Sequence, residues 1–322
     1  MKVGYAMPVL LLSGLVLAAC SRDLPTSTPV SAPASEPLAA SESARRSDAR
    51  VFTGAGDINA SVNAFRDALG TLNANLPGSR DGGRREINWD AVPAANTDTN
   101  DFPVDFFNQP APGRARGAVF STEGTGFRVS DNNFTDLNPE FSNEFVFFSP
   151  IRTFAPVGSN RMTQTFFVPG SNVPASSTGF GVVFSDVDRK GSASIRLFDA
   201  QGRNLGQFEA PVAPGGLSFV GVVFPTARVA SVEIKSGQAT VAAGATDVGN
   251  RRRGDDDDAG AAEARVAAGR DERDDDSSRP RDLVIMDDFI YGEPIAISRG
   301  VPVSMPMNAG LTSSKGGGSG AR

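Results

Sequence analysis

The sequence at 179–199, GFGVVFSDVDRKGSASIRLFD, decides the fold class. In its first part Phe180, Val182 and Phe184 fall on one face of an extended chain, because successive side chains of a strand point to opposite sides. A polar turn and a second run with the same alternation follow. The residues at 199–202, DAQG, then place a glycine where a tight hairpin turn needs a positive φ. The stretch therefore predicts two β-strands and a hairpin turn.

Short alternating runs of this kind continue on both sides and predict an all-β protein. Each run is bounded by turn-forming residues, which is the pattern of strands and turns. The predicted strands are 117–121, 126–130, 144–149, 162–168, 179–185, 194–199, 205–209, 217–224, 229–235 and 283–291. A series of short strands separated by turns is typical of β-sandwiches. We therefore predict a jelly-roll-like two-sheet β-sandwich over residues 86–294.

The segment at 51–85 has a different period. Its apolar residues recur at spacings of three and four, which places them on one stripe of a helix: Ile58, Val62, Phe65, Leu69 and Leu72. Asp57 can cap this helix at its start, and a Pro-Gly pair at 77–78 ends it. We predict one short helix within 57–76 that packs on the sandwich through the stripe, rather than a helix that binds a partner.

The N-terminus has the pattern of an export signal. Lys2 supplies a positive charge, and the apolar run at 7–19 is shorter than the about 20 residues that span a bilayer. The run ends in LAAC at 17–20, which resembles the lipobox of bacterial lipoproteins. The resemblance implies a signal peptide at 1–19, a lipid on Cys20 and attachment to a membrane, for which double acylation suffices. An ordinary secretory signal that happens to contain a cysteine is the alternative.

The residues after Cys20 indicate location and a spacer. Ser21 stands where a retained lipoprotein has Asp, and this resembles the pattern sent to the outer membrane. We therefore expect a cell-envelope protein, lipid-anchored in the outer membrane or otherwise on the outer face of the cytoplasmic membrane. Residues 20–50 are rich in Ser, Pro and Ala and bury too little apolar surface to fold, so they are predicted to be a disordered linker.

The composition excludes several chemistries. The chain has no histidine and Cys20 is its one cysteine, which excludes Ser-His and Cys-His catalysis and metal sites built on His or Cys. A net charge of −6 argues against nucleic-acid partners. No phosphate-binding loop, nucleophile elbow or dinucleotide motif is present, and no spacing selects a glycosidase pair among the many acidic residues. We therefore do not expect an enzyme.

Residues 237–282 interrupt the β pattern with blocks of opposite charge at 251–253, 255–258 and 274–276. Such blocks with few large apolar residues stay solvated, so we predict a disordered insert, in a loop between two paired strands. The Gly- and Ser-rich tail at 295–322 is also predicted to be disordered.

Several stretches together resemble a group of uncharacterised secreted bacterial proteins. They are 83–90 (GRREINWD), 105–108 (DFFN), 124–127 (GTGF), the GFG and DVD motifs within 179–188, and 286–292 (MDDFIYG). The last stretch is also similar to the closing strand of galactose-binding-like and carbohydrate-binding-module jelly rolls. In those folds an Asp near this position often helps to hold a structural calcium ion, so the resemblance implies such an ion here.

Asp287 and Asp288 are the first candidate calcium ligands. Adjacent strand residues point to opposite faces, and both faces of this strand are otherwise apolar: Ile285, Phe289 and Tyr291 on one, Val284, Met286 and Ile290 on the other. At least one carboxylate should therefore be partly buried. A buried carboxylate needs a cation or several donors, which leaves structural calcium or a pairing to Arg and backbone N–H groups.

Asp186 and Asp188 are the second candidate calcium ligands. They occupy the first and third positions of an EF-hand-like loop, but Lys190 stands at the fifth and Leu197 at the twelfth, where oxygen ligands are required. A calcium loop of that class is excluded. The alternative for this pair is a polar turn between two strands.

Trp89 is the candidate platform for a sugar, with Asn88 and Asp90 beside it and Tyr291 as a second aromatic. The alternative is that a single Trp at the start of the first strand belongs to the core, as the many Phe residues do by alternation. Exposure of Trp89 separates the two interpretations.

Three functions follow from these observations. The first is a non-catalytic binding or adhesion module, with glycan as the expected ligand class. The second is a structural envelope lipoprotein that binds protein or no small ligand. The third is a carbohydrate-active enzyme that works with carboxylates alone, which would require a deep groove with two carboxyl groups in it.

Overall fold

The computed structural model describes residues 48–248 and 281–297. The predicted signal peptide, Cys20, and almost all of the linker and the tail lie outside these ranges, as do residues 249–280 of the insert. In the described part of the chain no helix is long and apolar enough to cross a membrane.

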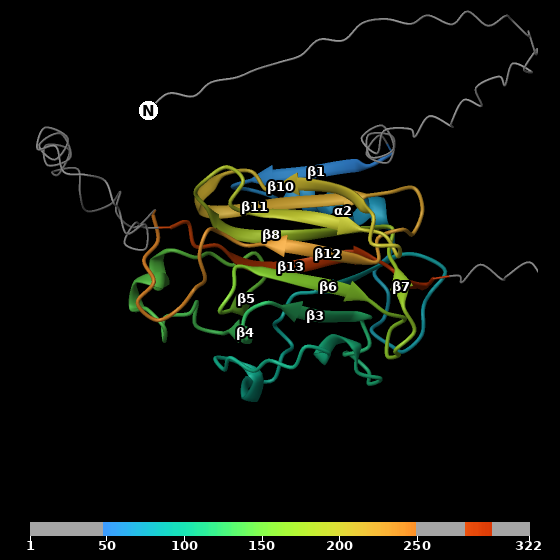
Figure 1. Cartoon of the computed structure of the whole chain (residues 1–322), viewed down its shortest axis with the longest axis horizontal. Helices are drawn as coiled ribbons and strands as arrows, with labels where there is room; N and C mark the ends of the chain where they lie inside the picture. The colour runs from blue at the N-terminus through green and yellow to red at the C-terminus, as the bar shows by residue number, and fades with distance from the viewer. Residues whose placement is uncertain (1–47, 249–280, 298–322) are drawn as a thin grey trace, which may run out of the picture. The chain divides into compact units, whose positions relative to one another are not determined.

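Two antiparallel sheets make up the domain (Figure 1). One has seven strands: β1 (Arg50–Ala55), β2 (Arg84–Ile87), β4 (Gly126–Ser130), β5 (Thr153–Val157), β8 (Gly179–Val187), β11 (Ala213–Val223) and β13 (Ile285–Gly292). The other has five: β3 (Ala118–Thr122), β6 (Arg161–Phe166), β9 (Ser194–Phe198), β10 (Asn204–Glu209) and β12 (Ser231–Lys235). The short strands β7 (Ala175–Ser176) and β14 (Ile295–Ala296) form a separate pair.

The chain passes between the two sheets as in a jelly roll. Strands β3 and β6 pair in the five-stranded sheet, while β4 and β5, which lie between them in sequence, pair in the seven-stranded sheet. Strands β8 to β11 repeat this arrangement with the sheets exchanged, because β8 pairs with β11 and β9 pairs with β10. A ribbon folded over in this way closes two sheets around one core, and the predicted all-β sandwich is confirmed.

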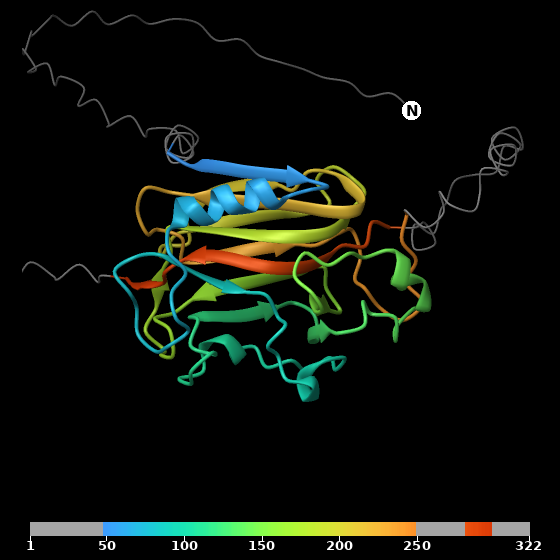
Figure 2. The same cartoon turned by 180° about the vertical axis from the view of Figure 1, so that it is seen from behind.

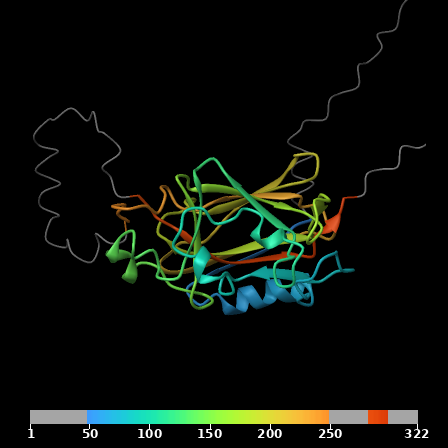
Figure 3. The same ribbon diagram turned by 90° about the horizontal axis from the view of Figure 1, so that it is seen from below.

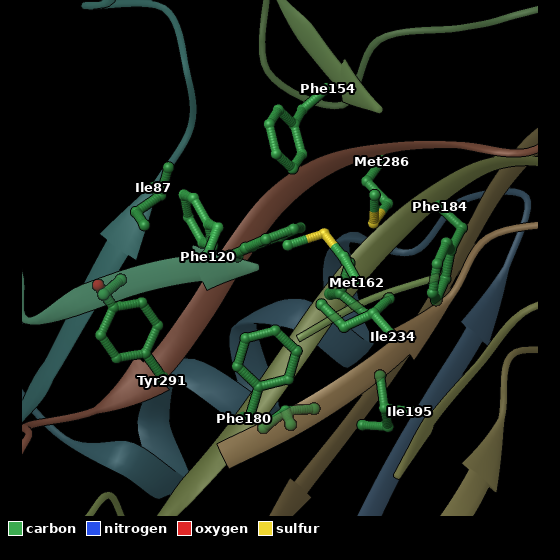
Figure 4. Close-up of a cluster of buried hydrophobic side chains, with 14 of the residues drawn as sticks. Ile87, Phe120, Phe154, Met162, Phe180, Phe184, Ile195, Ile234, Met286 and Tyr291 are labelled. Carbon is green, nitrogen blue, oxygen red and sulfur yellow. The ribbon is translucent and has the colours of Figure 1, made fainter. Parts of the chain in front are cut away.

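The core lies between the sheets and is built from the inward side chains of their strands. Strand β8 supplies Phe180, Val182 and Phe184, as the alternation predicts, and Met162 and Ile234 lie on the five-stranded side. Figure 4 shows these side chains pointing toward one another from both sheets. Burial of one such side chain stabilises the fold by about 1.5–3 kcal/mol, so this cluster is the main source of stability.

The helix α2 (Asn59–Leu69) covers part of the outer face of the seven-stranded sheet (Figures 2 and 3). Phe65, in the middle of its apolar stripe, packs closely on two glycines of the sheet. A Cβ atom at Gly181 or Gly221 would lie 2.7 or 2.8 Å from the Phe65 ring, so only glycine fits at these positions. The prediction of one short helix docked by its stripe is confirmed.

The predicted helix was too long at its C-terminal end. It ends at Leu69 because Gly70 adopts a φ of 98°, a conformation that glycine favours. Leu72 therefore lies beyond the helix and is 51% exposed. At the other end the N-cap is Ile58 and not Asp57 as predicted; Asp57 precedes it and accepts a hydrogen bond from the backbone N–H of Asn59 at 3.1 Å.

Two loop segments cover the rest of this outer face. Phe134, Phe141 and Phe145, near the short 3-10 helix η3 (Pro139–Asn143), pack with Val241 against Ala155 and Ile285 of the sheet; the other 3-10 helices are η1 (Ala94–Asn96) and η2 (Phe106–Asn108). All residues of β8 and β13 are consequently buried. Strands β6 and β12 of the other sheet keep every second residue accessible.

The structure corrects five further sequence predictions. Residues 144–149 form a loop, not a strand, while β1, β2, β5, β7 and β14 were not predicted as strands. The sandwich begins at β1 and not at residue 86, because β1 pairs along its whole length with β11. Strands β12 and β13, which flank the insert, lie in different sheets and are not paired with each other. Asp247 and Asp282, near the ends of the insert, are fully buried rather than solvated.

Candidate functional site

Trp89 lies in the core and not on the surface. Its ring stacks on Phe154 with 3.9 Å between the centroids, and its indole N–H donates a hydrogen bond to the backbone oxygen of Asp287 at 2.8 Å. It has no exposed area, so the prediction of a sugar platform at Trp89 is wrong. The amide of Asn88 donates to Asp90, whose carboxylate accepts from the backbone N–H of Ile151 at 2.7 Å, so these two residues hold a loop.

Tyr291 is also fully buried. Its hydroxyl donates to the backbone oxygen of Arg116 at 3.0 Å, and its ring lies 5.2 Å from that of Phe166. Burial raises the pKa of Tyr291 above its ordinary value. Tyr291 is therefore no second platform, because its aromatic body serves the core and its polar atom has a partner within the protein.

Asp287 and Asp288 are both buried, as expected for at least one of them. A β-bulge between Met286 and Phe289 changes the predicted faces, since the bulge places both of these residues in the main core. Strict alternation had assigned them to opposite faces. An extra residue in one strand reverses the direction of every side chain that follows it.

The oxygens of this aspartate pair all have partners from the protein. Asp287 accepts hydrogen bonds from the backbone N–H of Phe148 at 2.7 Å and of Ser149 at 3.3 Å. The Ser149 hydroxyl lies 3.0 Å from Asp287 Oδ1 and 2.8 Å from Asp288 Oδ1, and the Arg66 guanidinium lies 3.3 Å from Asp288 Oδ2. The donors that the sequence offered as the alternative to calcium are present.

The electrostatics of the pair follow from this environment. Burial raises the pKa of Asp287 well above its ordinary value, and the neighbouring Asp288 carboxylate raises it further. Burial also raises the pKa of Asp288, while Ser149 and the positive charge of Arg66 act in the opposite direction. The two carboxyl groups are in hydrogen-bonding contact, so a proton held between them relieves their repulsion.

Asp186 and Asp188 belong to a different group of carboxylates, named here the acidic cluster. It consists of Glu144 after η3, Asp186 and Asp188 at the end of β8, Asp247 from the start of the insert and Asp282 before β13. One carboxylate oxygen each of Glu144, Asp186 and Asp247 lie within 4.8 Å of one another. Asp188 contacts Asp247, and Asp282 also lies close enough to affect Asp188.

Backbone N–H groups hold three of these carboxylates in place. Asp186 accepts from Gly215 at 2.6 Å, Asp247 from Leu283 at 2.7 Å and Asp282 from Arg189 at 2.7 Å; Asp186 itself has a φ of 66°. Three other oxygens of the cluster are buried without a hydrogen-bond partner among the described residues: Asp186 Oδ2, Asp188 Oδ2 and Asp282 Oδ1.

Burial is the main cause of raised pKa values in the cluster. It raises the pKa of Glu144 to about 7, of Asp186 to about 8 and of Asp188 to about 7, and neighbouring carboxylates add to each shift. The pKa of Asp282 is raised for the same reason. Oxygen donors of this kind suit a hard divalent cation, which would favour the charged forms.

The sequence prediction missed Glu144, Asp247 and Asp282. Glu144 was assigned to a strand, and the other two stand within a segment whose composition indicates solvation. The one usable signal was at Asp282, which directly precedes the apolar run of β13 and so had a reason to be near the core.

The outer face of the five-stranded sheet is the second notable site. In the strand register Ser121, Thr163, Glu233, Arg196 and Gln207 lie side by side, one from each strand. Strands are about 4.8 Å apart, so this row is about 19 Å long. Beside it a groove of about 430 Å³ is lined by Ser121, Thr122, Glu123, Arg161, Met162, Thr163, Glu233 and Ile234.

Comparisons with known proteins do not identify a family for this chain. No family model matches the sequence, and no curated protein matches it. Among solved structures, the enzymatically active domain of tailspike protein 4 from bacteriophage CBA120 is similar at 18% identity, over 45% of this chain and 21% of that chain. The TM-score is 0.16, and a likeness this weak carries no argument about fold or function.

Proposed function

We propose that this chain is a lipid-anchored protein of the cell envelope whose sandwich is a non-catalytic binding module, with the outer face of the five-stranded sheet as its binding surface. The observation that carries the proposal is the difference between the two outer faces. Helix α2 and apolar loops cover the seven-stranded sheet, whereas every second residue of β6 and β12 is accessible.

The side chains on this face suit a glycan as ligand. The row combines two hydroxyl groups, an amide, a carboxylate and a guanidinium, which together donate to and accept from sugar hydroxyls. Arg196 is held by hydrogen bonds to Gln207 at 2.9 Å and by an ion pair to Glu233 at 3.4 Å, so its direction is fixed before a ligand arrives. Preorganised polar groups lose less entropy on binding.

A catalytic role for the groove has less support. A glycosidase needs one carboxyl group kept protonated by an apolar environment beside a second, ionised one. Of the two glutamates in the groove, Glu233 is 44% exposed in its side chain and lies beside the Arg196 guanidinium, so it lacks an apolar environment. We therefore propose binding without turnover.

The test is a glycan array probed with the full chain, followed by titration of any ligand found. Arg196→Ala and Thr163→Ala are expected to weaken binding by about tenfold or more, since they remove central polar contacts. Asn63→Ala, at an exposed position of α2 on the opposite face, is the matched control and should bind as the unsubstituted chain does. Equal binding by all three variants would contradict the proposed surface.

A structural envelope protein is the second candidate function, favoured by the burial of Trp89 and Tyr291. Sugar sites commonly use an exposed aromatic ring, and neither predicted aromatic is exposed. An array on which the full chain binds no glycan would favour this candidate over the binding module.

The anchor is tested separately from the binding surface. Cys20 lies outside the described residues, and its lipidation is proposed from the LAAC motif at 17–20. Cys20→Ser is expected to move the protein from the membrane fraction to the soluble fraction without changing its unfolding transition. Retention of the variant in the membrane fraction would contradict lipid anchoring.

A further inference from the structure

The acidic cluster gathers carboxylates from four separate parts of the chain at one end of β8. We infer that Glu144, Asp186, Asp188, Asp247 and Asp282 form a calcium-binding site. The site is separate from the Asp287 and Asp288 pair, and nothing in the proposed function of the sheet face depends on it.

The spacing of the oxygens fits a single ion. Ligand oxygens lie about 2.3–2.6 Å from calcium, so two oxygens on one ion are at most about 5 Å apart. One oxygen each of Glu144, Asp186 and Asp247 satisfy this limit, because all three lie within 4.8 Å of one another. Asp188 contacts Asp247, and Asp282 acts on Asp188 through its charge, so these two carboxylates border the group of three.

Unpaired buried oxygens are the independent sign of a missing ligand. Asp186 and Asp282 have no exposed area, yet each has one oxygen without a hydrogen-bond partner, and so does the half-buried Asp188. A buried charged oxygen without a partner costs about 1–3 kcal/mol or more. The other oxygens of Asp186 and Asp282 are held by backbone N–H groups, so the unpaired ones are fixed in position.

Within the described residues, ion pairs do not supply the missing partner of these oxygens. Among the described residues, none of the ion pairs involves Glu144, Asp186, Asp188 or Asp282. Two basic side chains near the cluster have other partners, since Arg189 donates to Gln238 and Lys235 donates to the backbone oxygen of Gly191.

The chemistry of the ligands favours calcium over other ions. All five ligands are carboxylates and the chain has no histidine, which argues against metals that prefer nitrogen or sulfur. Calcium accepts six to eight oxygens in irregular geometry, whereas magnesium requires near-octahedral geometry and keeps several waters. The positive charge of the ion would offset the repulsion among the carboxylates, which together with burial raises the pKa values of Glu144, Asp186 and Asp188.

The position of the ligands indicates what the ion would do. Asp247 and Asp282 stand at the two ends of the insert, so a shared ion ties those ends together. Asp186 belongs to the seven-stranded sheet, and Asp247 lies beside Arg281, just before β13 of the same sheet. Calcium would therefore tie the insert to this end of the seven-stranded sheet.

The test measures calcium binding and thermal unfolding of the full chain, purified in detergent and stripped of metal with a chelator. Calcium is expected to bind with a Kd at or below about 1 mM, the range of extracellular modules. At 100 times Kd the melting temperature should rise by about 5–10 °C for a domain of this size. No heat of binding and no shift at about 10 mM calcium would overturn the site. An equal shift with magnesium would overturn the assignment to calcium.

Two cluster variants and one control distinguish ligand loss from misfolding. Asp188→Asn and Glu144→Gln should melt at or above the temperature of the unsubstituted chain in chelator, because each removes a repelling charge, and should lose at least half of the calcium shift. Asp67→Asn, an exposed position on α2, should keep the whole shift. A full calcium shift in both cluster variants would overturn the proposal.

Discussion

Two groups of buried carboxylates lie in this sandwich, and they differ in how their charge is compensated. The first is the pair Asp287 and Asp288 in β13, where backbone N–H groups, a serine hydroxyl and a guanidinium occupy every oxygen. The second is the acidic cluster, where three buried oxygens have no partner. Both groups have raised pKa values because both are buried.

The difference comes from the loop at 144–149 rather than from the aspartates. Phe148 and Ser149, at the end of this loop, turn their donors toward Asp287, whereas Glu144 at its start adds one more carboxylate to the cluster. The same loop thus donates hydrogen bonds to one acidic group and adds a carboxylate to the other. Burial alone therefore does not distinguish the two groups; the missing donors are what favour a cation at the acidic cluster.

The largest expected effect is a loss of stability on replacing Asp287, whose carboxylate accepts hydrogen bonds from the protein. Asp287→Ala leaves the backbone N–H groups of Phe148 and Ser149 without their acceptor in a buried place, which is expected to cost about 3–4 kcal/mol of unfolding free energy. Urea denaturation measures it, and the loss should be the same with calcium and with chelator. Asp67→Asn is the control, expected within about 0.5 kcal/mol. A loss below about 1 kcal/mol would show that the donors find other partners.

The next effect is the pH dependence of stability, which should respond to calcium. Carboxyl groups with raised folded-state pKa values bind protons more tightly when folded, so their stabilisation is complete below the unfolded values of about 4 and is lost as pH rises through about 7–8. In chelator, unfolding free energy should fall by at least about 2 kcal/mol between pH 5 and 8. Calcium should abolish the part of this pH dependence that comes from the acidic cluster. The part that comes from Asp287 and Asp288 should remain.

Asp188→Asn provides the control for this pH dependence. The variant lacks one of the titrating groups, so its stability in chelator should fall less steeply with pH than that of the unsubstituted chain. A pH dependence that is identical with calcium and with chelator would contradict the difference drawn between the two acidic groups.

A third buried polar group, the uncharged amide of Gln164, lacks hydrogen-bond partners among the described residues. Its replacement is expected to change stability by a smaller amount. Gln164 of β6 lies between the sheets with no exposed area, and neither amide atom has a hydrogen-bond partner. Gln164→Met keeps the volume and removes the unpaired atoms, so we expect a gain of about 1–2 kcal/mol by urea denaturation, with no dependence on calcium. A loss of stability would mean that water satisfies the amide.

The sequence predicted the architecture better than the sites, and particular residues explain why. Alternation located β8 because its large side chains, Phe180, Val182 and Phe184, all face the main core. Strand β5 was missed because Pro156 interrupts its pattern; the proline is tolerated since β5 pairs with β13 only at Phe154. Residues 144–149 have a similar apolar pattern and form a loop, since their side chains pack over the sheet instead of within it.

The sites depend on features that periodicity does not contain. The bulge at Asp287 and Asp288 adds one residue to the strand, and no local pattern places it. Asp247 and Asp282 are buried at the edges of a segment whose average composition is that of a solvated loop, and averages hide single residues. Trp89 was predicted as a sugar platform because its neighbours are polar, but those neighbours bind the 150–152 loop while the ring stacks on Phe154.

The smallest expected effect is at the exposed carboxylate of Glu233, which differs from the two buried acidic groups in being open to solvent. The Glu233 and Arg196 side chains are 44% and 41% exposed and lie 3.4 Å apart, so solvent screens their attraction. A double-mutant cycle with Glu233→Ala and Arg196→Ala should give a coupling of at most about 0.5 kcal/mol, and this should decrease at high salt. Substitutions at exposed positions such as these change stability little. A loss of ligand binding by the same variants would therefore come from the missing side chains on the sheet face and not from unfolding. A coupling above about 1 kcal/mol would place this pair with the buried groups and make it unsuitable as a probe of binding.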